Sequence, residues 1–209
     1  MPSLTAVNRP SALFDVLRPL LESAAGGPLP QWQQAVVPAL QVRTVEAGGS
    51  VFLQDVHHPY AYGVRSGLVK LCYYSDDGNE WIKSFAEEGR FFASIAALQP
   101  QGRTSFMVTA VEPCVLEQVD YRVLSALAAQ HLPWARALHA LTMVFAARKE
   151  QRERELLTLA PLERYVAFRD AYPALERRIP QKDLARHLGL TPVGLNRIVA
   201  RVRQAEAST

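Results

Sequence analysis

Four polar side chains near the carboxyl end of the sequence are of the types that recognise DNA. Asn196 and Arg197 are neighbours, and Arg201 and Arg203 follow shortly after them. The apolar residues around them repeat with the period of a helix: Leu195, Ile198, Val199 and Val202. The polar side chains therefore face outward from a helix that can lie in the major groove, where Asn matches adenine edges and Arg matches guanine edges or phosphates.

A shorter helical pattern precedes this helix. Its apolar face is formed by Leu184, Ala185 and Leu188. Gly189 can end the first helix in the left-handed conformation, Thr191 can cap the second with its hydroxyl, and Pro192 suits the first helical position. An ordinary helical hairpin would share the leucine and alanine pattern. The joint placement of the glycine, the cap and Leu195 favours a helix-turn-helix that binds DNA.

Positive charge is concentrated around this motif. The net charge of the 209 residues is +3, yet residues 161–209 carry nine basic and five acidic groups, against 10 basic and 12 acidic in residues 1–147. A phosphate-binding surface needs such an excess, although a solvated basic face would also show it. We expect Asn196 and Arg197 to contact base edges or nearby phosphates. The residues expected to contact the DNA backbone are Lys182, Thr191, Arg201 and Arg203.

Composition excludes several other classes of protein. The hydrophobic fraction of 49% is that of a globular chain, and neither a run of membrane-spanning length nor a signal peptide is present. The two cysteines, Cys72 and Cys114, lie within alternating apolar stretches, so buried thiols are favoured over a disulfide, a metal site or a thiolate-held iron–sulfur cluster. We expect a cytoplasmic protein with no membrane partner.

Short strands dominate the region from Leu40 to Asp120, between helical segments. Helices are expected at 11–25, where Leu13, Val16, Leu17, Leu20 and Leu21 form a stripe, and at 30–39. The expected strands are Val42–Glu46, Ser50–Leu53, Tyr60–Arg65, Leu68–Ser75, Glu80–Ala86, Ser105–Val111 and Val115–Asp120. Asp76–Asn79 is a hairpin turn and Gly67 marks a bend. This pattern indicates a closed or double-sheet β architecture.

Helical spacing returns at Tyr121–Gln130 and continues in a long helix expected at Pro133–Leu157. Four apolar residues of that helix have the spacing of a coiled-coil seam: Trp134, Leu138, Leu141 and Phe145. Dimerisation is favoured because the mixed-charge stretch that follows suits a connector between domains, but packing of this face on the β domain is the alternative. Ala160-Pro161 marks a domain break. After Arg203 only six residues remain, so we expect no structured wing after the recognition helix.

In their order along the chain, several stretches resemble the Crp/Fnr family of bacterial transcription regulators. They are Gly48–Gln54, Tyr62–Leu71, Asp77–Glu80, Glu88–Phe92 and Pro161–Arg203. The resemblance implies an α+β fold: an N-terminal β-roll of the double-stranded β-helix or jelly-roll type, a long dimerisation helix and a C-terminal winged-helix-like helix-turn-helix. The implied domains are a β-roll sensing domain (1–132), the dimerisation helix and linker (133–160) and the DNA-binding domain (161–209). The implied partners are a second copy of the chain, double-stranded DNA with a near-palindromic operator and, as a further candidate, RNA polymerase.

Two departures from the family pattern bear on function. The resemblance places the effector pocket at Phe92, Ala93, Ser94, Ile95, Thr104 and Ser105. Ser94 aligns with the family's glutamate for the ribose hydroxyl and Thr104 with its arginine for the cyclic phosphate, so we do not expect cyclic AMP to bind. Arg103 is adjacent, but a shift of one position along a strand reverses the face. In the recognition helix, Pro192 and Val193 replace the family's Arg and Glu.

Two rival interpretations remain open at this point. A cupin-like barrel could hold a metal through His57-His58, but the β region has no third histidine, so surface loop histidines are favoured and no metal is expected. A small-molecule sensor could also act through a protein partner without DNA. We expect no cofactor, no catalytic residues and no enzymatic activity. The effector, the operator sequence and the choice between activation and repression stay open.

Overall fold

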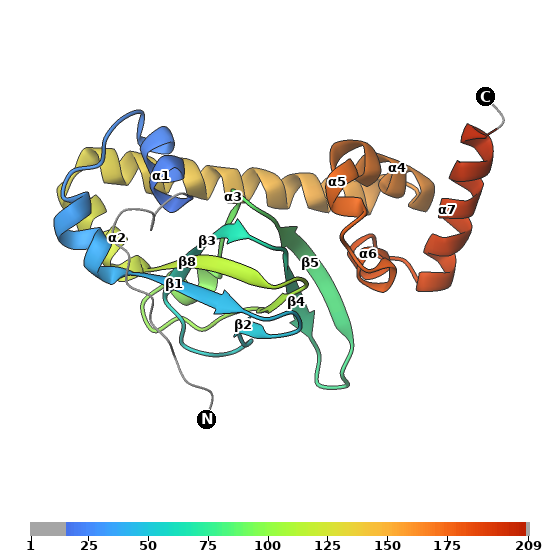
Figure 1. Ribbon diagram of the computed structural model, residues 1–209, viewed down its shortest axis with the longest axis horizontal. Helices are drawn as coiled ribbons and strands as arrows, with labels where there is room; N and C mark the ends of the chain where they lie inside the picture. The colour runs from blue at the N-terminus through green and yellow to red at the C-terminus, as the bar shows by residue number, and fades with distance from the viewer. Residues whose placement is uncertain (1–15, 208–209) are drawn as a thin grey trace.

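The computed structural model describes residues 16–207, and its amino-terminal part is built from two four-stranded antiparallel sheets (Figure 1). The first sheet has the order β1 (Leu40–Val45), β8 (Cys114–Asp120), β3 (Tyr60–Ser66) and β6 (Phe91–Ala93). The second has the order β2 (Ser50–Phe52), β7 (Met107–Ala110), β4 (Val69–Tyr74) and β5 (Glu80–Ala86). The predicted β-roll is confirmed, with all seven predicted strands present and β6 added.

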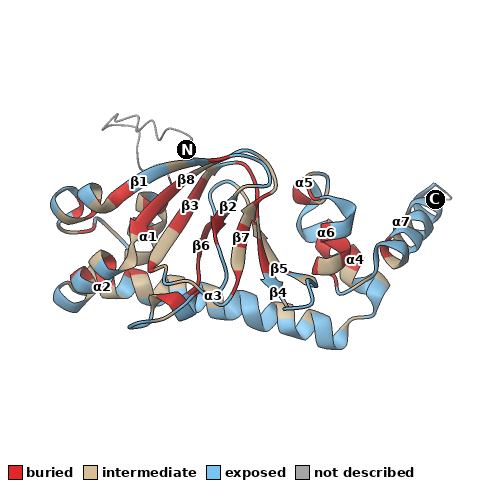
Figure 2. Cartoon of the chain, turned by 90° about the horizontal axis from the view of Figure 1, so that it is seen from below, coloured by how far each residue is buried: buried red, intermediate tan, exposed pale blue. Residues whose placement is uncertain are grey.

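The alternating strands place their apolar side chains between the two sheets, and the buried residues of Figure 2 follow this interior. Tyr62, Val64 and Leu116 from one sheet meet Val69 and Val108 from the other, all five fully buried. The predicted hairpin at Asp76–Asn79 joins β4 to β5. Cys72 and Cys114 are buried free thiols, as predicted.

Helices cover the outer face of the first sheet. They are α1 (Leu17–Ala25), a π-helical turn at Trp32–Val36, a 3₁₀ turn at Val37–Ala39, and α2 (Tyr121–Gln130). Another 3₁₀ turn, Ile95–Leu98, follows β6. The predicted helix at 11–25 is confirmed from Leu17 onward, whereas 11–15, including Leu13, lies outside the described residues. Two short turns replace the helix predicted at 30–39.

The longest element is α3 (Leu132–Thr158), 27 residues that run past the β-roll to the carboxyl-terminal helices (Figure 1). Trp134 is fully buried, stacks on Trp32 with ring centroids 5.9 Å apart, and donates its indole N–H to the carbonyl of Pro30 at 2.9 Å. Phe145 meets Phe91 edge-on, with centroids 4.7 Å apart. This face of α3 therefore completes the core of its own chain.

This packing removes Trp134 from the predicted dimer seam, whereas the partly buried Leu138, Leu141 and Phe145 stay a prediction. Trp134 is not available to a second chain, and Leu138, Leu141 and Phe145 pack against the cluster that α1, α2 and the first sheet also build. Helical periodicity shows which residues share a face but not what covers that face. Packing on the β domain, which had been the alternative, is what the structure has for Trp134.

Four helices make up the carboxyl-terminal region: α4 (Pro161–Ala171), α5 (Pro173–Glu176), α6 (Gln181–His187) and α7 (Pro192–Glu206). Between residues 161 and 207 the structure contains no strand, so the winged part of the expected winged-helix-like domain is not found in this region. α7 stands at the end of the molecule farthest from α1 and α2 (Figure 1). Among residues 16–207 no helix is both long and apolar enough to cross a membrane.

Candidate nucleic-acid interface

The turn between α6 and α7 has the geometry that its sequence predicts. Gly189 has φ +67°, and a Cβ there would lie 3.1 Å from an Nη of Arg164, so a side chain would be both strained and crowded. The backbone N–H of Leu190 donates to the carbonyl of Ala185 at 2.8 Å. The hydroxyl of Thr191 accepts the N–H of Gly194 at 3.0 Å, which caps α7.

The inner faces of the two helices form one apolar cluster with α4. Ala185 and Leu195 are fully buried, with exposed fractions of 0%. Leu184 and Leu188 are buried in the same cluster. The small Ala185 side chain allows α7 to approach α6 closely. Arg164 of α4 donates to the carbonyl of Leu188 at 2.7 Å, which satisfies one of the free carbonyls at the end of α6.

The six residues predicted to contact DNA are all at the surface of the protein. They are Lys182, Thr191, Asn196, Arg197, Arg201 and Arg203. Because α7 advances by 100° per residue, Arg197 lies nearly opposite the buried Leu195, whereas Asn196 and Arg203 lie on one flank. Arg203 lines a hollow between α5, α6 and α7. The structure therefore brings Arg197 and Arg201 to the outward face and leaves Arg203 at its edge.

Val193 is an outward residue that the sequence interpretation did not select. Its side chain is 61% exposed in the first turn of α7, one turn before Arg197 and on the same outward face. An exposed β-branched side chain gains nothing from solvent, but it can contact the methyl group of thymine in a major groove. The signal available in the sequence was its place outside the periodic apolar stripe.

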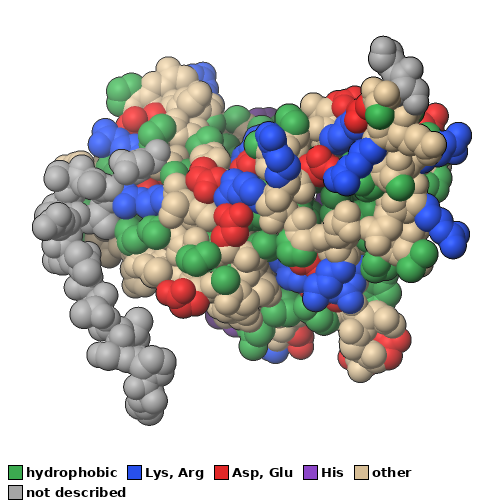
Figure 3. Space-filling model, turned by 45° about the vertical axis from the view of Figure 1, so that its right-hand side comes forward, with side chains coloured by type: hydrophobic (Ala, Val, Ile, Leu, Met, Phe, Trp, Pro, Cys, Tyr) green, Lys and Arg blue, Asp and Glu red, His purple; other side chains and the backbone are tan. Residues whose placement is uncertain are grey.

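The basic side chains on this side of the molecule differ in whether they are paired with carboxylates within the described part of the chain. Figure 3 shows Lys and Arg side chains distributed over the end that carries the helix-turn-helix. Arg197 and Arg201 have no ion-pair or hydrogen-bond partner within the described part of the chain, so they are available to phosphates or bases. By contrast, Arg178 and Arg186 are paired with carboxylates of the β-roll. The excess positive charge counted from the sequence is therefore larger than the positive charge that remains free to contact DNA.

Aromatic side chains pack closely around the position of the predicted effector pocket. Phe92, with an exposed fraction of 1%, stacks on Tyr62 with centroids 5.0 Å apart and planes 6° apart. His58 continues this ring column, with its Nε2 2.7 Å from the Tyr62 hydroxyl. Burial lowers the pKa of His58 to about 4, and the nearby Arg43 contributes to the shift. The interior is therefore aromatic around these rings, and the guanidinium of Arg43 donates to the Tyr62 hydroxyl at 3.3 Å.

The hydroxyls at the positions of the family's ribose and phosphate ligands are used internally. Thr104 is buried, donates to the carbonyl of Leu53 at 2.6 Å and accepts the N–H of Val56 at 3.0 Å. Ser94 is buried and accepts the N–H of Ser105 at 3.1 Å. The bonds of Thr104 hold the segment between β6 and β7 against the residues that follow β2.

The remaining residues of the predicted pocket do not converge on one cavity. Phe92, Ala93, Ser94 and Thr104 are buried, but Ile95 is 43% exposed and Ser105 also faces solvent. Arg103 pairs with Asp55 at 2.7 Å, with 59% of its side chain exposed, so it does not point into the roll.

The two neighbouring histidines do not form a ligand set. His57 contacts the carbonyl of Gly102 at 3.2 Å through Nδ1, while His58 turns inward to Tyr62. Among residues 16–207 no group of three or more His, Cys, Asp or Glu side chains lies close enough to hold a metal ion.

The β-roll is similar to a known domain family. Residues 42–131 match the family described as the cyclic nucleotide-binding domain. This match begins in β1 and ends just after α2, so it covers the two sheets and the helix behind them. A β-roll joined by a long helix to a helix-turn-helix is the architecture of the Crp/Fnr regulators, and the resemblance predicted from the sequence is confirmed for the fold.

Solved structures with this architecture cover most of the chain. FixK2 from Bradyrhizobium japonicum is 19% identical, with a TM-score of 0.70 over 80% of this chain and 86% of that one. The c-di-GMP responsive global regulator CLP from Xanthomonas campestris is 18% identical, with a TM-score of 0.65 over 81% and 89%. The Thermus thermophilus catabolite activator protein is 24% identical, with a TM-score of 0.50 over 94% and 88%. A search of curated proteins gave no match.

Proposed function

We propose that this protein is a sequence-specific, DNA-binding transcription regulator of the Crp/Fnr type that acts as a homodimer. The observation that carries the proposal is the outward face of α7. It presents Arg197 and Arg201 without partners in the described chain, on a helix that a glycine turn and a threonine cap fix to α6. A helix held in this way can enter the major groove while α6 crosses the backbone.

The proposed contacts divide into two kinds. Asn196, Arg197 and Val193 lie in the first half of α7 and are proposed to read base edges, including a thymine methyl for Val193. Proposed contacts to the DNA backbone come from Lys182, Thr191, Arg201 and Arg203. Arg203 is the weakest of these, because it stands at the edge of the face.

We propose that two copies associate through the face of α3 opposite Trp134. Ala140, Met143 and Ala147 recur there at the steps of three and four residues that define a coiled-coil seam, and Met143 is 55% exposed. The small alanines on either side of Met143 allow two helices to approach closely. Symmetric recognition helices would then select a near-palindrome with half-sites about one helical turn apart.

We further propose three functional regions: the β-roll at 1–132, the helix and linker at 133–160 and the DNA-binding region at 161–209. We propose that the β-roll does not bind cyclic AMP. The internal hydrogen bonds of Thr104 and Ser94 and the ring column of Tyr62 and Phe92 support this proposal. A phosphate buried without a cationic partner would lose the charge-assisted bonds that make such sites tight.

The proposal is tested by selecting DNA fragments with the purified full-length protein and measuring affinity for the enriched sequence. Arg197→Ala should weaken binding to that operator by roughly 1–3 kcal/mol per half-site and relax preference at one base pair. Arg103→Ala removes the same charge from an exposed position of the β-roll and should leave affinity nearly unchanged. Equal loss on operator and random DNA would show that Arg197 only contacts phosphate.

The experiment also separates this function from its rival. A small-molecule sensor that acts through a protein partner would select no sequence, and any weak binding would fall with salt equally for all fragments. That outcome, with the protein folded, would contradict DNA-sequence recognition as the function. RNA polymerase is a further proposed partner, testable by adding it to the operator complex.

A further inference from the structure

The core of the helix-turn-helix is completed by the β-roll. Leu68, in the turn between β3 and β4, is fully buried in the same apolar cluster as Leu184 and Leu195. Phe85 of β5 and Val111, just after β7, pack against that cluster as well. Side chains of the β-roll therefore cover one face of the helix-turn-helix core.

The turn that delivers Leu68 is tightly fixed. Gly67 has φ +91°, and a Cβ there would lie 2.4 Å from the carbonyl oxygen of Pro113 and 2.7 Å from the sulfur of Cys114. The Cys114 thiol donates to the carbonyl of Leu68 at 3.4 Å. The N–H of Gly67 donates to Glu88 at 2.7 Å. Only glycine fits this position, so the shape of the turn is set by the β-roll.

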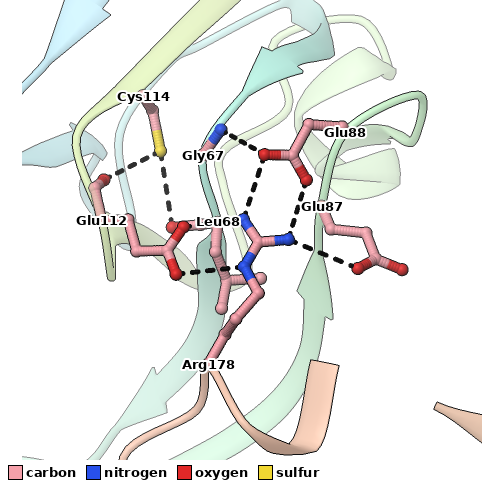
Figure 4. Close-up of polar contacts among 7 residues, drawn as sticks. All are labelled: Gly67, Leu68, Glu87, Glu88, Glu112, Cys114 and Arg178. Carbon is pink, nitrogen blue, oxygen red and sulfur yellow. Dashed lines mark hydrogen bonds and ion pairs between the residues drawn. The ribbon is translucent and has the colours of Figure 1, made fainter. Parts of the chain in front are cut away.

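Arg178, in the segment between α5 and α6, reaches across to this same turn (Figure 4). Its Nη1 and Nη2 donate to the two oxygens of Glu88 at 2.8 and 3.0 Å. Its Nε and Nη2 donate to the two oxygens of Glu112 at 3.0 and 2.6 Å. Glu87 lies 3.6 Å from Nη1. One guanidinium therefore bridges two carboxylates in bidentate geometry, and Glu88 in turn holds Gly67.

The charges of this cluster depend on one another. The hydrogen bonds from Arg178 lower the pKa of Glu88 to about 2, and the bonds from Glu112 and Glu88 raise the pKa of Arg178 above its ordinary value. Without the guanidinium, three glutamates would face one another at the edge of the turn. Arg178 thus offsets part of the negative charge of a site that belongs to the β-roll, although it comes from the helix-turn-helix region.

A second ionic contact fixes α6 itself. Lys70 of β4 lies 3.1 Å from Asp183 of α6 and 2.8 Å from Glu80 of β5, with only 13% of its side chain exposed. Burial opposes the charge of Lys70, yet hydrogen bonds to Glu80 and Asp183 raise its pKa. Arg186 of α6 also pairs with Glu80. The helix-turn-helix region is therefore joined to the β-roll by two separate groups of ionic contacts in addition to the apolar cluster around Leu68.

We propose that Arg178 is a positioning residue for DNA binding, which holds the recognition helix at a fixed orientation to α3 through Glu88 and Glu112. In a dimer joined along α3, this orientation sets the distance between the two copies of α7 and hence the half-site spacing that the protein accepts. The inference rests on the proposed function, but the contact it describes can be measured without DNA.

The decisive variant leaves Arg178 in place and removes its partners. Glu88→Gln/Glu112→Gln makes the protein more positive, so electrostatics alone would tighten DNA binding. If Arg178 acts by positioning, this variant instead binds the best operator roughly tenfold more weakly and tolerates half-sites one base pair closer or farther apart. Glu46→Gln/Asp76→Asn removes two exposed carboxylates from the same domain and is the matched control. Tighter binding with an unchanged spacing preference would overturn the proposal.

A second measurement separates positioning from folding and from DNA contact. Spin labels on cysteines introduced at Gln99 and Ala207 report the distance between the β-roll and α7 in the full-length protein. Arg178→Gln should broaden that distribution while the thermal transition remains cooperative, and Arg178→Lys should restore it only in part, because an ammonium cannot bridge two carboxylates in bidentate fashion. An unchanged distance distribution in Arg178→Gln would refute the positioning role. Failure of the wild-type protein to bind DNA would instead count against the proposed function alone, and the distance measurement would still test the contact.

Discussion

Val193 illustrates what a single exposed side chain implies at a proposed interface. If it contacts a thymine methyl, Val193→Ala should lower the discrimination between thymine and cytosine at one position of each half-site, by roughly 1 kcal/mol, while non-specific binding stays the same. The measurement compares wild-type and variant affinities for the operator and for its thymine-to-cytosine version. Replacing thymine by uracil removes only the methyl group and should reproduce the effect in the wild type. No difference between thymine and uracil operators would contradict this contact.

His187 makes stability depend on pH. Burial, with a smaller contribution from Arg152, lowers its pKa to about 3, so the folded state keeps the ring neutral between Phe85 and Phe168. The unfolded chain takes up a proton near pH 6.5, so stability is fully present above that pH and falls as pH drops toward 3, by at most about 1.4 kcal/mol per pH unit. His187→Gln should flatten the change in unfolding free energy between pH 6.5 and 5. The exposed His139→Gln should not, and equal slopes in all three proteins would refute the role of His187.

The polar residues of α7 could be predicted from the sequence because a period of 3.6 fixes which positions face outward. Val193 was missed because an apolar residue type is assumed to face inward. Arg178 could not have been assigned a partner, since nothing local connects it with carboxylates 66 and 90 positions away in the chain. Contacts of that kind depend on how complete elements pack.

The long helix α3 carries a prediction of its own. Met143→Asp places a charge in the middle of the proposed seam and removes roughly 1.5–3 kcal/mol of apolar burial from each copy, so the dimer should dissociate and operator affinity should fall. Lys149→Ala changes the net charge by the same unit on another side of the helix and should stay dimeric. Sedimentation of both variants at several concentrations is the measurement. A dimer that survives Met143→Asp would exclude this face.

Helices and strands could be predicted from the sequence where the residue pattern within the element itself was enough to identify it. Alternation and turn residues located seven strands, and the limits of the helix at Tyr121–Gln130 agree with the structure. β6 has only three residues, too few for alternation to show. The apolar stripe of α3 was identified correctly, but Trp134 completes the core of its own chain, so the sequence alone did not show what covers each part of the stripe. An apolar stripe on a helix indicates that this face is buried, but it does not indicate which surface buries it.

For the molecule as a whole, the packing of side chains inside the β-roll predicts that cyclic AMP does not bind. Isothermal titration of the full-length protein should give no saturable heat up to millimolar nucleotide, and operator affinity should be the same with and without it. The physical reason is that the hydroxyls of Thr104 and Ser94 already form hydrogen bonds within the chain. Micromolar binding would show that the rings of Tyr62 and Phe92 can separate to admit a ligand.

Covering the helix-turn-helix with the β-roll also has a consequence for biosynthesis. Lys70 and Asp183 are 113 positions apart, so the ribosome completes the turn around Leu68 long before the helices that bury it. At roughly 5–20 residues per second, the nascent β-roll presents that leucine and an unpaired cluster of glutamates for about 6–23 s. During this interval the growing chain exposes apolar surface that is buried in the finished protein. Its last helices close that surface as they emerge.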